Sequence, residues 1–382
     1  MGVPTPGARV GGTALPIPML VEDLGQDARF DIRILAYGRW EENEPLAVKV
    51  VHQIVDLLRY PLRLHRARPD LVHLHSSFDR KTIVRDLAFG ALTRVAGRPL
   101  LVEWHGAEVD LLHHRSLLWR AGSRLLLRVT SALAVLADEV RTELARTGFD
   151  KPCFLVKNPI DLARFTRPVD LRRRWGIEPS APLLLFISRL ISTKGLLDVI
   201  DAMSRLSAQE AHLLVVGDGP ERQPAEARTQ QLGLAKRIHF TGQVQEAEAV
   251  DFYCGCDVLV LPTYAAEGFP MSIFQAVAAG QGIITTRIRA AADHLTEPDH
   301  CLFVPPRDPV AIAHAIDRLL SDPHLLASMR RNNRDLGPRF ERRRVAGEFG
   351  DIYLQMAEGV RARRDARALP SAHRGAKATG VR

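Results

Sequence analysis

Residues 267–280 read EGFPMSIFQAVAAG and follow the apolar run Val258–Leu261. They place an acidic side chain, Glu267, on a loop that contains glycine and proline, ahead of an apolar helix beginning at Pro270 or Met271. Proline suits a first helical turn because its missing N–H has no partner inside the helix there. The remaining free N–H groups of a helix start favour a bound phosphate. Since a carboxylate repels phosphate, we expect Glu267 to bind another group, and a polyol such as a sugar is well suited.

Short apolar runs recur along both halves of the chain, and helix-length segments separate most of them. The runs are continuous, which is typical of strands covered on both faces of a parallel sheet. The pattern predicts an α/β chain with two doubly wound, Rossmann-like domains facing a cleft, where loops at the carboxyl ends of the strands converge. The predicted strands are Ile32–Ala36, Leu71–His75, Leu100–Trp104, Ala132–Leu136, Phe154–Lys157, Leu183–Ile187, Leu213–Val216, Ile238–Phe240, Val258–Leu261, Ile283–Thr285 and Leu302–Val304.

Breaks in this pattern set the predicted boundaries. Prolines and an arginine run indicate a linker at 161–181, between domains at 1–160 and 182–345. Gly11 and Gly12 look like a glycine turn that opens a helix, yet residues 1–10 contain no convincing strand. We therefore expect the first strand of the N-terminal domain to be missing, and hypothesise a true start about ten residues upstream, which is one strand and a lead-in.

Bulk composition excludes several classes of protein. The 382 residues are 46% hydrophobic and 25% charged, as in an ordinary two-domain globular protein. Seven basic residues and one acid at 361–382 supply six of the eight net positive charges, so this segment reads as a disordered basic tail and no nucleic-acid partner is expected. Four cysteines without zinc spacing predict reduced thiols in a cytoplasmic protein. No apolar run is long enough to span a membrane, and no signal peptide is visible.

Two cations follow a predicted strand in the second half. Arg189 comes directly after Leu183–Ile187, and Lys194 lies five residues later. Arginine offers a flat, permanently charged fork for phosphate oxygens, and lysine offers a point charge on a flexible stem. Together they can stabilise a leaving diphosphate. The alternative is a pair of ordinary surface cations at a helix start.

Other polar residues near strand ends are less specific. Gly217 begins a partial dinucleotide fingerprint, but Arg222 occupies the third glycine position, which favours a simple tight turn near the cleft. His105 ends a strand and can bind a substrate or act in acid–base chemistry, although a lone histidine is commonly structural.

The sequence contains few features that indicate a metal site or a membrane-binding surface. His73 and His75 share one face of a strand, but the sequence offers no third ligand beside them and no Asp-x-Asp pair, so no metal or cofactor is predicted. Arg120, Arg124 and Arg128 recur every four residues among leucines. Such a helix suits an anionic membrane surface, and equally an ordinary amphipathic helix.

In combination these motifs resemble the retaining glycosyltransferases of family 4, which have the two-domain GT-B fold, from Gly11 to about Met356. The resemblance implies an acceptor-side first domain, a nucleotide-sugar-binding second domain and a closing helix at 346–360. It gives Glu267 hydrogen bonds to hydroxyls of the donor sugar. It assigns the remaining contacts with the sugar, diphosphate or base of the donor to a set of residues in the second domain. These are Arg189, Lys194, Gly217, Val244, Gly268, Phe269, Pro270 and Met271.

The resemblance also places Gly11 and Gly12 near acceptor and phosphate, and His105 beside the reacting sugar. The chain departs from the family at Gln275, where a second glutamate accepts hydrogen bonds from the nucleotide ribose. Because a neutral acceptor replaces a charged one, the expected loss of donor binding is about 1 kcal/mol.

The leading hypothesis is a metal-independent, retaining glycosyltransferase that moves a sugar from a nucleotide diphosphate sugar to a hydroxyl acceptor. His105, Glu267, Arg189 and Lys194 would be its catalytic residues. By family analogy the acceptor is a lipid-linked saccharide of cell-envelope or exported polysaccharide synthesis, at the inner face of an anionic membrane. A second hypothesis, favoured by Gln275 and the short N-terminus, is a non-catalytic sugar-nucleotide-binding or scaffold component of a polysaccharide assembly complex. An NAD-dependent oxidoreductase is disfavoured, because no complete glycine fingerprint exists.

Overall fold

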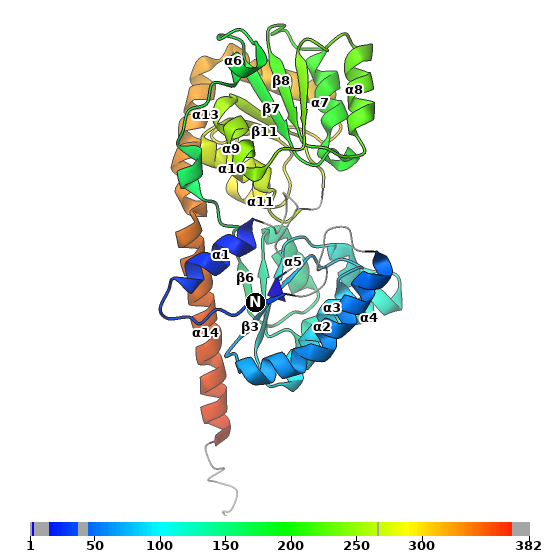
Figure 1. Ribbon diagram of the computed structural model, residues 1–382, viewed down its shortest axis with the longest axis vertical. Helices are drawn as coiled ribbons and strands as arrows, with labels where there is room; N and C mark the ends of the chain where they lie inside the picture. Colours follow the sequence, from blue (N-terminus) through cyan, green and yellow to red (C-terminus); the bar gives the residue numbers. More distant parts are fainter. Residues whose placement is uncertain (1, 4–14, 37–44, 266, 369–382) are drawn as a thin grey trace, which may run out of the picture.

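The computed structural model describes residues 2–3, 15–36, 45–265 and 267–368. Two α/β domains lie end to end, each built on a six-stranded parallel sheet, and a long C-terminal helix runs along both (Figure 1). This arrangement confirms the predicted fold. Gly11 and Gly12, which we assigned to an acceptor and phosphate loop, lie outside the described residues.

The N-terminal sheet has the order β2-β1-β3-β4-β5-β6. Its strands are β1 (Gly2–Val3), β2 (Leu35–Ala36), β3 (Val72–Ser76), β4 (Leu100–Trp104), β5 (Ala132–Val135) and β6 (Cys153–Leu155). The central strands are fully buried because helices cover both faces of the sheet. These helices are α1 (Pro16–Gly25), α2 (Leu46–Ala67), α3 (Ile83–Val95), α4 (Leu117–Val129) and α5 (Asp138–Arg146), with the 3-10 turn η2 (Val109–His113).

The C-terminal sheet has the order β12-β11-β10-β7-β8-β9. Its strands are β7 (Leu183–Ile187), β8 (His212–Val216), β9 (Ile238–Gly242), β10 (Val258–Leu261), β11 (Gly282–Thr285) and β12 (Leu302–Phe303). The helices that cover it are α7 (Leu196–Met203), α8 (Arg222–Gln231), α9 (Glu246–Gly255), α10 (Met271–Ala279), α11 (Arg289–His294), α12 (Pro309–Ser321) and α13 (Pro323–Leu336). Every one of the eleven predicted strands overlaps an observed one.

The first strand corrects the sequence analysis. Gly2–Val3 forms β1 in the sheet interior, where Gly2 pairs with Leu35 of β2 and with Leu74 of β3. The first strand is therefore present in the described chain, but only two residues of it are paired. A run that short, next to prolines and glycines, carries no strand pattern that a reader of the sequence could recognise.

The connections also differ from the predicted boundaries. The segment between the domains contains the 3-10 turn η3 (Leu162–Phe165) and the short helix α6 (Leu171–Trp175). After the 3-10 turn η5 (Gly337–Phe340), α14 spans Arg342–Ala368, so it begins before residue 346 and continues past residue 360 into the predicted tail. Residues 361–368 are mostly alanine and arginine, which are strong helix formers even without an apolar period.

All four cysteines are free, as predicted, and burial raises the pKa of Cys153 to about 11 and that of Cys301 to about 12.

Within the described residues, no helix combines the length and apolar character needed to cross a membrane.

Candidate active site between the two domains

The loops that follow β4 and β10 meet at the border between the domains. Gly106 forms an isolated antiparallel bridge with Glu267, and the Gly268 N–H donates to the His105 carbonyl at 3.2 Å. A Cβ at Gly268 would lie 2.7 Å from that carbonyl oxygen, so only glycine permits this approach. The contact brings His105 of one domain beside Glu267 of the other.

A buried cation fixes the Glu267 carboxylate. Lys194 ends the 3-10 turn η4 (Ser192–Lys194) after β7, and its side chain is only 5% exposed. Its Nζ lies 2.6 Å from Glu267 Oε2. Tyr264 holds the turn in place, since its N–H donates to the Thr193 carbonyl and its hydroxyl donates to the Ser192 carbonyl. The structure thus joins two predicted site residues in one ion pair.

Arg189 stands at the end of the neighbouring strand β7. Its loop packs against Gly217, where a Cβ would lie 1.9 Å from the Ser188 carbonyl oxygen and where φ is +129°. The Leu190 N–H donates to the Asp218 carbonyl at 2.9 Å and completes this contact. The Arg189 side chain is exposed and makes no ion pair with any residue that the structure describes. It is therefore free to bind an anion.

The start of α10 lies where the sequence predicts it. Pro270 is the N-cap and Met271 the first helical residue. Phe269 is buried and stacks on Phe274 with 3.8 Å between the ring centroids. Its ring thus belongs to the core, and Phe269 can contact a donor only through its backbone.

Gln275 is buried beside a carboxylate that the sequence analysis missed. Its Nε2 donates to Glu246 Oε1 at 3.1 Å, and Arg164 contacts the same oxygen at 3.2 Å. Burial raises the pKa of Glu246, and the Arg164 charge and the Gln275 hydrogen bond oppose that shift. Glu246 begins α9, two residues after the half-buried Val244 in the loop after β9. The chain therefore has a carboxylate next to the position where Gln275 lacks one.

The predicted site histidine His105 belongs to a buried polar cluster. Its Nε2 lies 2.9 Å from His75 Nδ1. Glu103 Oε2 lies 3.1 Å from both His73 Nε2 and His75 Nδ1. The sequence analysis found no third group beside the two histidines, because Glu103 comes from the adjacent strand, where its register partner is His75. Alternation along β4 offered one clue, since it places Glu103 and His105 on one face.

Burial decides the charge of this cluster. It lowers the pKa of His105 to about 4, so the imidazole is neutral at pH 7 and can both donate and accept a hydrogen bond. Burial on its own raises the pKa of Glu103, yet the neighbouring imidazoles of His105 and His73 outweigh it and hold that pKa well below its usual value.

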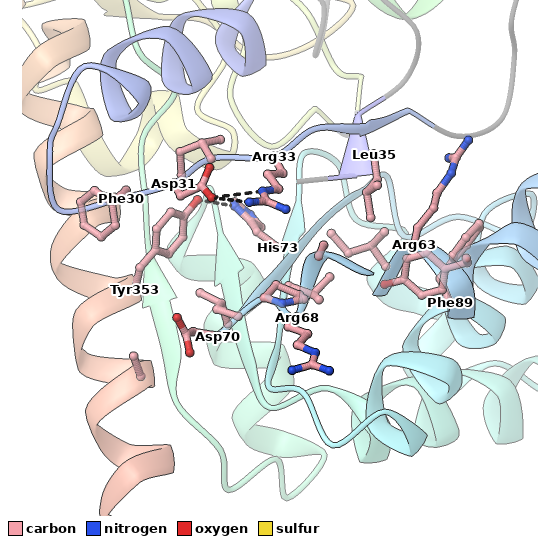
Figure 2. A pocket seen from close by; sticks show the side chains of 18 of the residues that line it. Phe30, Asp31, Arg33, Leu35, Arg63, Arg68, Asp70, His73, Phe89 and Tyr353 are labelled. Carbon is pink, nitrogen blue, oxygen red and sulfur yellow. Dashed lines mark hydrogen bonds and ion pairs between the residues drawn. The ribbon is translucent and has the colours of Figure 1, made fainter. Parts of the chain in front are cut away.

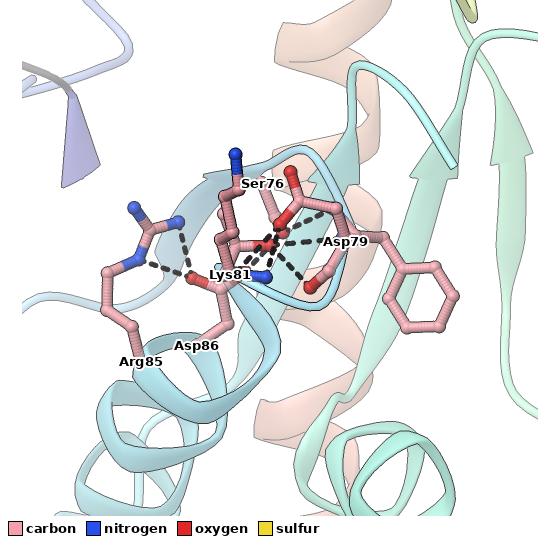
Figure 3. A network of polar contacts seen from close by, with 7 residues as sticks. Ser76, Asp79, Lys81, Arg85 and Asp86 are labelled. Atoms are coloured by element: carbon pink, nitrogen blue, oxygen red, sulfur yellow. Dashed lines mark hydrogen bonds and ion pairs between the residues drawn. The ribbon is translucent and has the colours of Figure 1, made fainter. Parts of the chain in front are cut away.

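The loop after β3 forms a rigid wall on the N-terminal side (Figure 3). Ser76 donates from its hydroxyl to the buried Asp86, which also accepts from Arg85 at 2.8 Å. Asp79 Oδ1 accepts from the backbone N–H groups of Lys81 and Thr82, both at 2.8 Å. Because β3 and β4 are parallel neighbours, this loop lies at the same sheet edge as His105. An acceptor bound there would meet a preorganised surface.

Comparisons with known proteins show what this chain resembles. Residues 170–336 match the family described as glycosyl transferases group 1. D-inositol 3-phosphate glycosyltransferase 2 of Catenulispora acidiphila is 29% identical over 243 residues, 59% of this chain and 56% of that protein. The putative teichuronic acid biosynthesis glycosyltransferase TuaC of Bacillus subtilis is 26% identical over 257 residues, which are 65% of this chain and 61% of that protein. The match thus spans less than two thirds of either relative.

A solved structure has the same fold. The crystal structure of Anabaena HepE in complex with UDP superposes with a TM-score of 0.71 at 19% identity, over 85% of this chain and 86% of that one. The fold is therefore GT-B, and the match to glycosyl transferases group 1 covers residues 170–336.

Proposed function

We propose that this chain, whose residues 170–336 match glycosyl transferases group 1, is a retaining glycosyltransferase of family 4 that uses a nucleotide diphosphate sugar. The observation that carries the proposal is the Lys194–Glu267 ion pair held against the His105 loop at the domain border. UDP bound to the structurally similar HepE supports a nucleotide donor.

Charges in the cleft supply the chemistry. Glu267 accepts hydrogen bonds from the donor sugar and is oriented by Lys194. As the bond between the anomeric carbon and the diphosphate oxygen breaks, Arg189 and Lys194 stabilise the negative charge on the leaving phosphate. The acceptor hydroxyl forms the new bond on the same face of the sugar and gives its proton to that phosphate. Neutral His105, once its ring turns away from His75 and Glu103, hydrogen-bonds to the sugar next to the reacting carbon. Arg189, together with Lys194 in its pair with Glu267, supplies positive charge at the diphosphate, and in this proposal the step uses no metal ion.

The contact between the domains excludes water from the reaction. Hydrolysis competes with transfer whenever water reaches the activated sugar. The Gly106–Glu267 bridge and the Gly268–His105 hydrogen bond join the two loops beside the proposed reacting groups. Ion pairs from Arg342 of α14 to Asp23 at 2.7 Å and to Glu22 at 2.8 Å of α1 brace the domains behind it.

A panel of UDP-, GDP- and ADP-sugars without added metal tests the proposal through thermal shift and nucleotide release. One donor should stabilise the protein and be slowly hydrolysed. Arg189→Ala should lower turnover roughly 10²-fold, as expected for removal of one transition-state contact, while the exposed Arg205→Ala should not. Binding without consumption, with acceptors present, would favour a non-catalytic sugar-nucleotide-binding role. Equal turnover of the Arg189 and Arg205 variants would contradict the proposed mechanism.

The acceptor in this proposal is a saccharide on a lipid carrier in an anionic membrane, as part of cell-envelope polysaccharide or glycolipid synthesis. On α2, Val51, Ile54, Leu58 and Leu62 form an exposed apolar stripe, and Leu58 is 75% exposed. On α4, Leu117, Leu118 and Leu125 are exposed beside the three arginines at four-residue spacing. Helices α2, α3 and α4 lie together on one side of the N-terminal domain (Figure 1). Exposed apolar and basic side chains together suit an anionic bilayer.

Vesicle flotation tests this membrane contact. The protein should float with vesicles that contain phosphatidylglycerol, and the pair Leu58→Glu and Leu118→Glu should abolish flotation. Val310→Glu, an exposed position on α12 of the other domain, is the matched control. Absence of flotation for the unaltered protein would rule out a direct membrane contact, while leaving the transferase proposal open.

A further inference from the structure

Two neighbouring strands place three metal-ligating side chains together. His73 and His75 alternate along β3, and Glu103 on β4 is the register partner of His75. All three are buried, and their ligand atoms lie within 4.8 Å of one another. They occupy the sheet face covered by α14, where Tyr353 contacts His73. This site lies behind His105 and is separate from the donor contacts.

The contact between His73 and Glu103 is short but does not have the geometry of a normal hydrogen bond. His73 Nδ1 lies 2.7 Å from the Tyr353 hydroxyl, and His73 Nε2 lies 3.1 Å from Glu103 Oε2. Neither His73 Nε2 nor Glu103 Oε2 makes a hydrogen bond of normal geometry within the described residues. With the ring proton on Nδ1, Nε2 presents a lone pair to a carboxylate oxygen. Two acceptors facing each other in a buried site are costly unless a cation lies between them.

The distances suit one tetrahedral ion. Ligands at about 2.0–2.1 Å from tetrahedral zinc lie about 3.3 Å from each other. Glu103 Oε2 lies 3.1 Å from His73 Nε2 and 3.1 Å from His75 Nδ1. We propose that His73 Nε2, His75 Nδ1 and Glu103 Oε2 bind one divalent transition-metal ion, preferentially zinc, for which two histidines and a carboxylate are a suitable ligand set.

The surroundings complete such a site. A zinc-binding histidine usually donates its other ring N–H to an oxygen, and Tyr353 provides that oxygen for His73. His73 and Tyr353 also line a cavity of about 350 Å³ between β2, β3, α2 and α14, which gives an ion a route inward (Figure 2). The ion joins β3 and β4, and through Tyr353 it ties α14 to them. It thereby fixes the strand end that carries His105.

Metal binding to the full chain, purified without a polyhistidine tag, tests this proposal independently of activity. Chelator-treated protein is titrated with cobalt(II), whose tetrahedral complexes absorb in the visible range, and zinc content is measured after dialysis. We expect one ion per chain. Glu103→Gln and His73→Gln should lose it, and Tyr353→Phe should weaken binding about 10- to 100-fold.

A second histidine pair is the matched control. His212 Nδ1 and His239 Nε2 lie 3.0 Å apart on β8 and β9, and no carboxylate among the described residues forms an ion pair with either ring. His239→Gln should therefore keep the metal. Absence of a tetrahedral cobalt spectrum in the unaltered protein, or equal metal content in the unaltered and Glu103→Gln proteins, would overturn the proposal. The cobalt titration needs no variant, so it remains decisive if a substitution prevents folding.

Discussion

The two domains share one architecture but build their halves of the site differently. In the C-terminal domain, Arg189, Lys194 and Glu267 stand on loops directly after apolar strands, and each can be recognised from its own stretch of sequence. In the N-terminal domain, His105 is supported by side chains from β3, β4 and α14 that are distant in sequence. The proposed donor half is thus encoded by local motifs, and the proposed acceptor half by strand pairing.

The largest effect expected from the local motifs comes from the Lys194–Glu267 pair. Lys194→Ala removes a diphosphate cation and leaves Glu267 without its partner, so turnover should fall about 10²–10³-fold. Glu267→Ala should cost a similar factor. The double variant should be little worse than either single one, because the two residues act as a unit. Steady-state kinetics of the unaltered protein, the two single variants and the double variant measure these losses in turnover. Additive losses would show that the two residues act separately.

The junction between the halves should be the next most sensitive point. Gly268→Ala places a Cβ 2.7 Å from the His105 carbonyl oxygen and should force the loops apart. A misplacement of about 1 Å can cost roughly 10²-fold in rate. Gly347→Ala on α14, where a Cβ meets nothing within 4 Å, is the control. Unchanged turnover of Gly268→Ala would mean that the observed loop contact is not needed for catalysis.

Acid should destabilise the C-terminal domain through His294. Burial, with the charges of Lys157 and Arg339, lowers its pKa from the usual 6.5 to about 4. Between those values the unfolded chain binds a proton that the folded chain excludes, so stability falls as the pH drops from about 6.5 to about 4. Thermal melts across this range should show a smaller loss for His294→Leu than for the exposed control His324→Gln. If the melting temperatures of the two variants fell in parallel with pH, His294 would not be a source of the acid sensitivity.

The smallest effect is expected at Gln275. Gln275→Glu restores the acid of the family that the chain resembles but places it against the half-buried carboxylate of Glu246, and like charges so close disfavour each other. Donor affinity should change by no more than several-fold, and the melting temperature should fall. Adding Glu246→Gln should recover stability. A large gain in affinity for the single variant would mean that Glu246 does not influence the donor site.

The sequence alone was sufficient to predict those features that are formed by a continuous stretch of the chain. All eleven predicted strands are present, and the Glu267 loop precedes α10 as the glycine and proline spacing indicates. It failed at β1, where two paired residues carry no pattern, and at α14, where helix propensity continues without an apolar period.

Side chains that meet across elements were also missed. Glu103 joins His73 and His75 only through the β3–β4 register, and Glu246 reaches Gln275 only because α9 and α10 pack together. Finding such partners requires the strand order and helix packing, which a single sequence does not specify.

The most direct test of the central claim is NMR of donor turnover. The protein is mixed with UDP-, GDP- and ADP-sugars, and the anomeric signals are followed from the first minutes, before the released sugar can mutarotate. The proposed mechanism predicts release of a nucleoside diphosphate and a first-formed sugar or glycoside with the anomeric configuration of the donor. Inverted product, or no consumption of any donor with acceptors present, would contradict it.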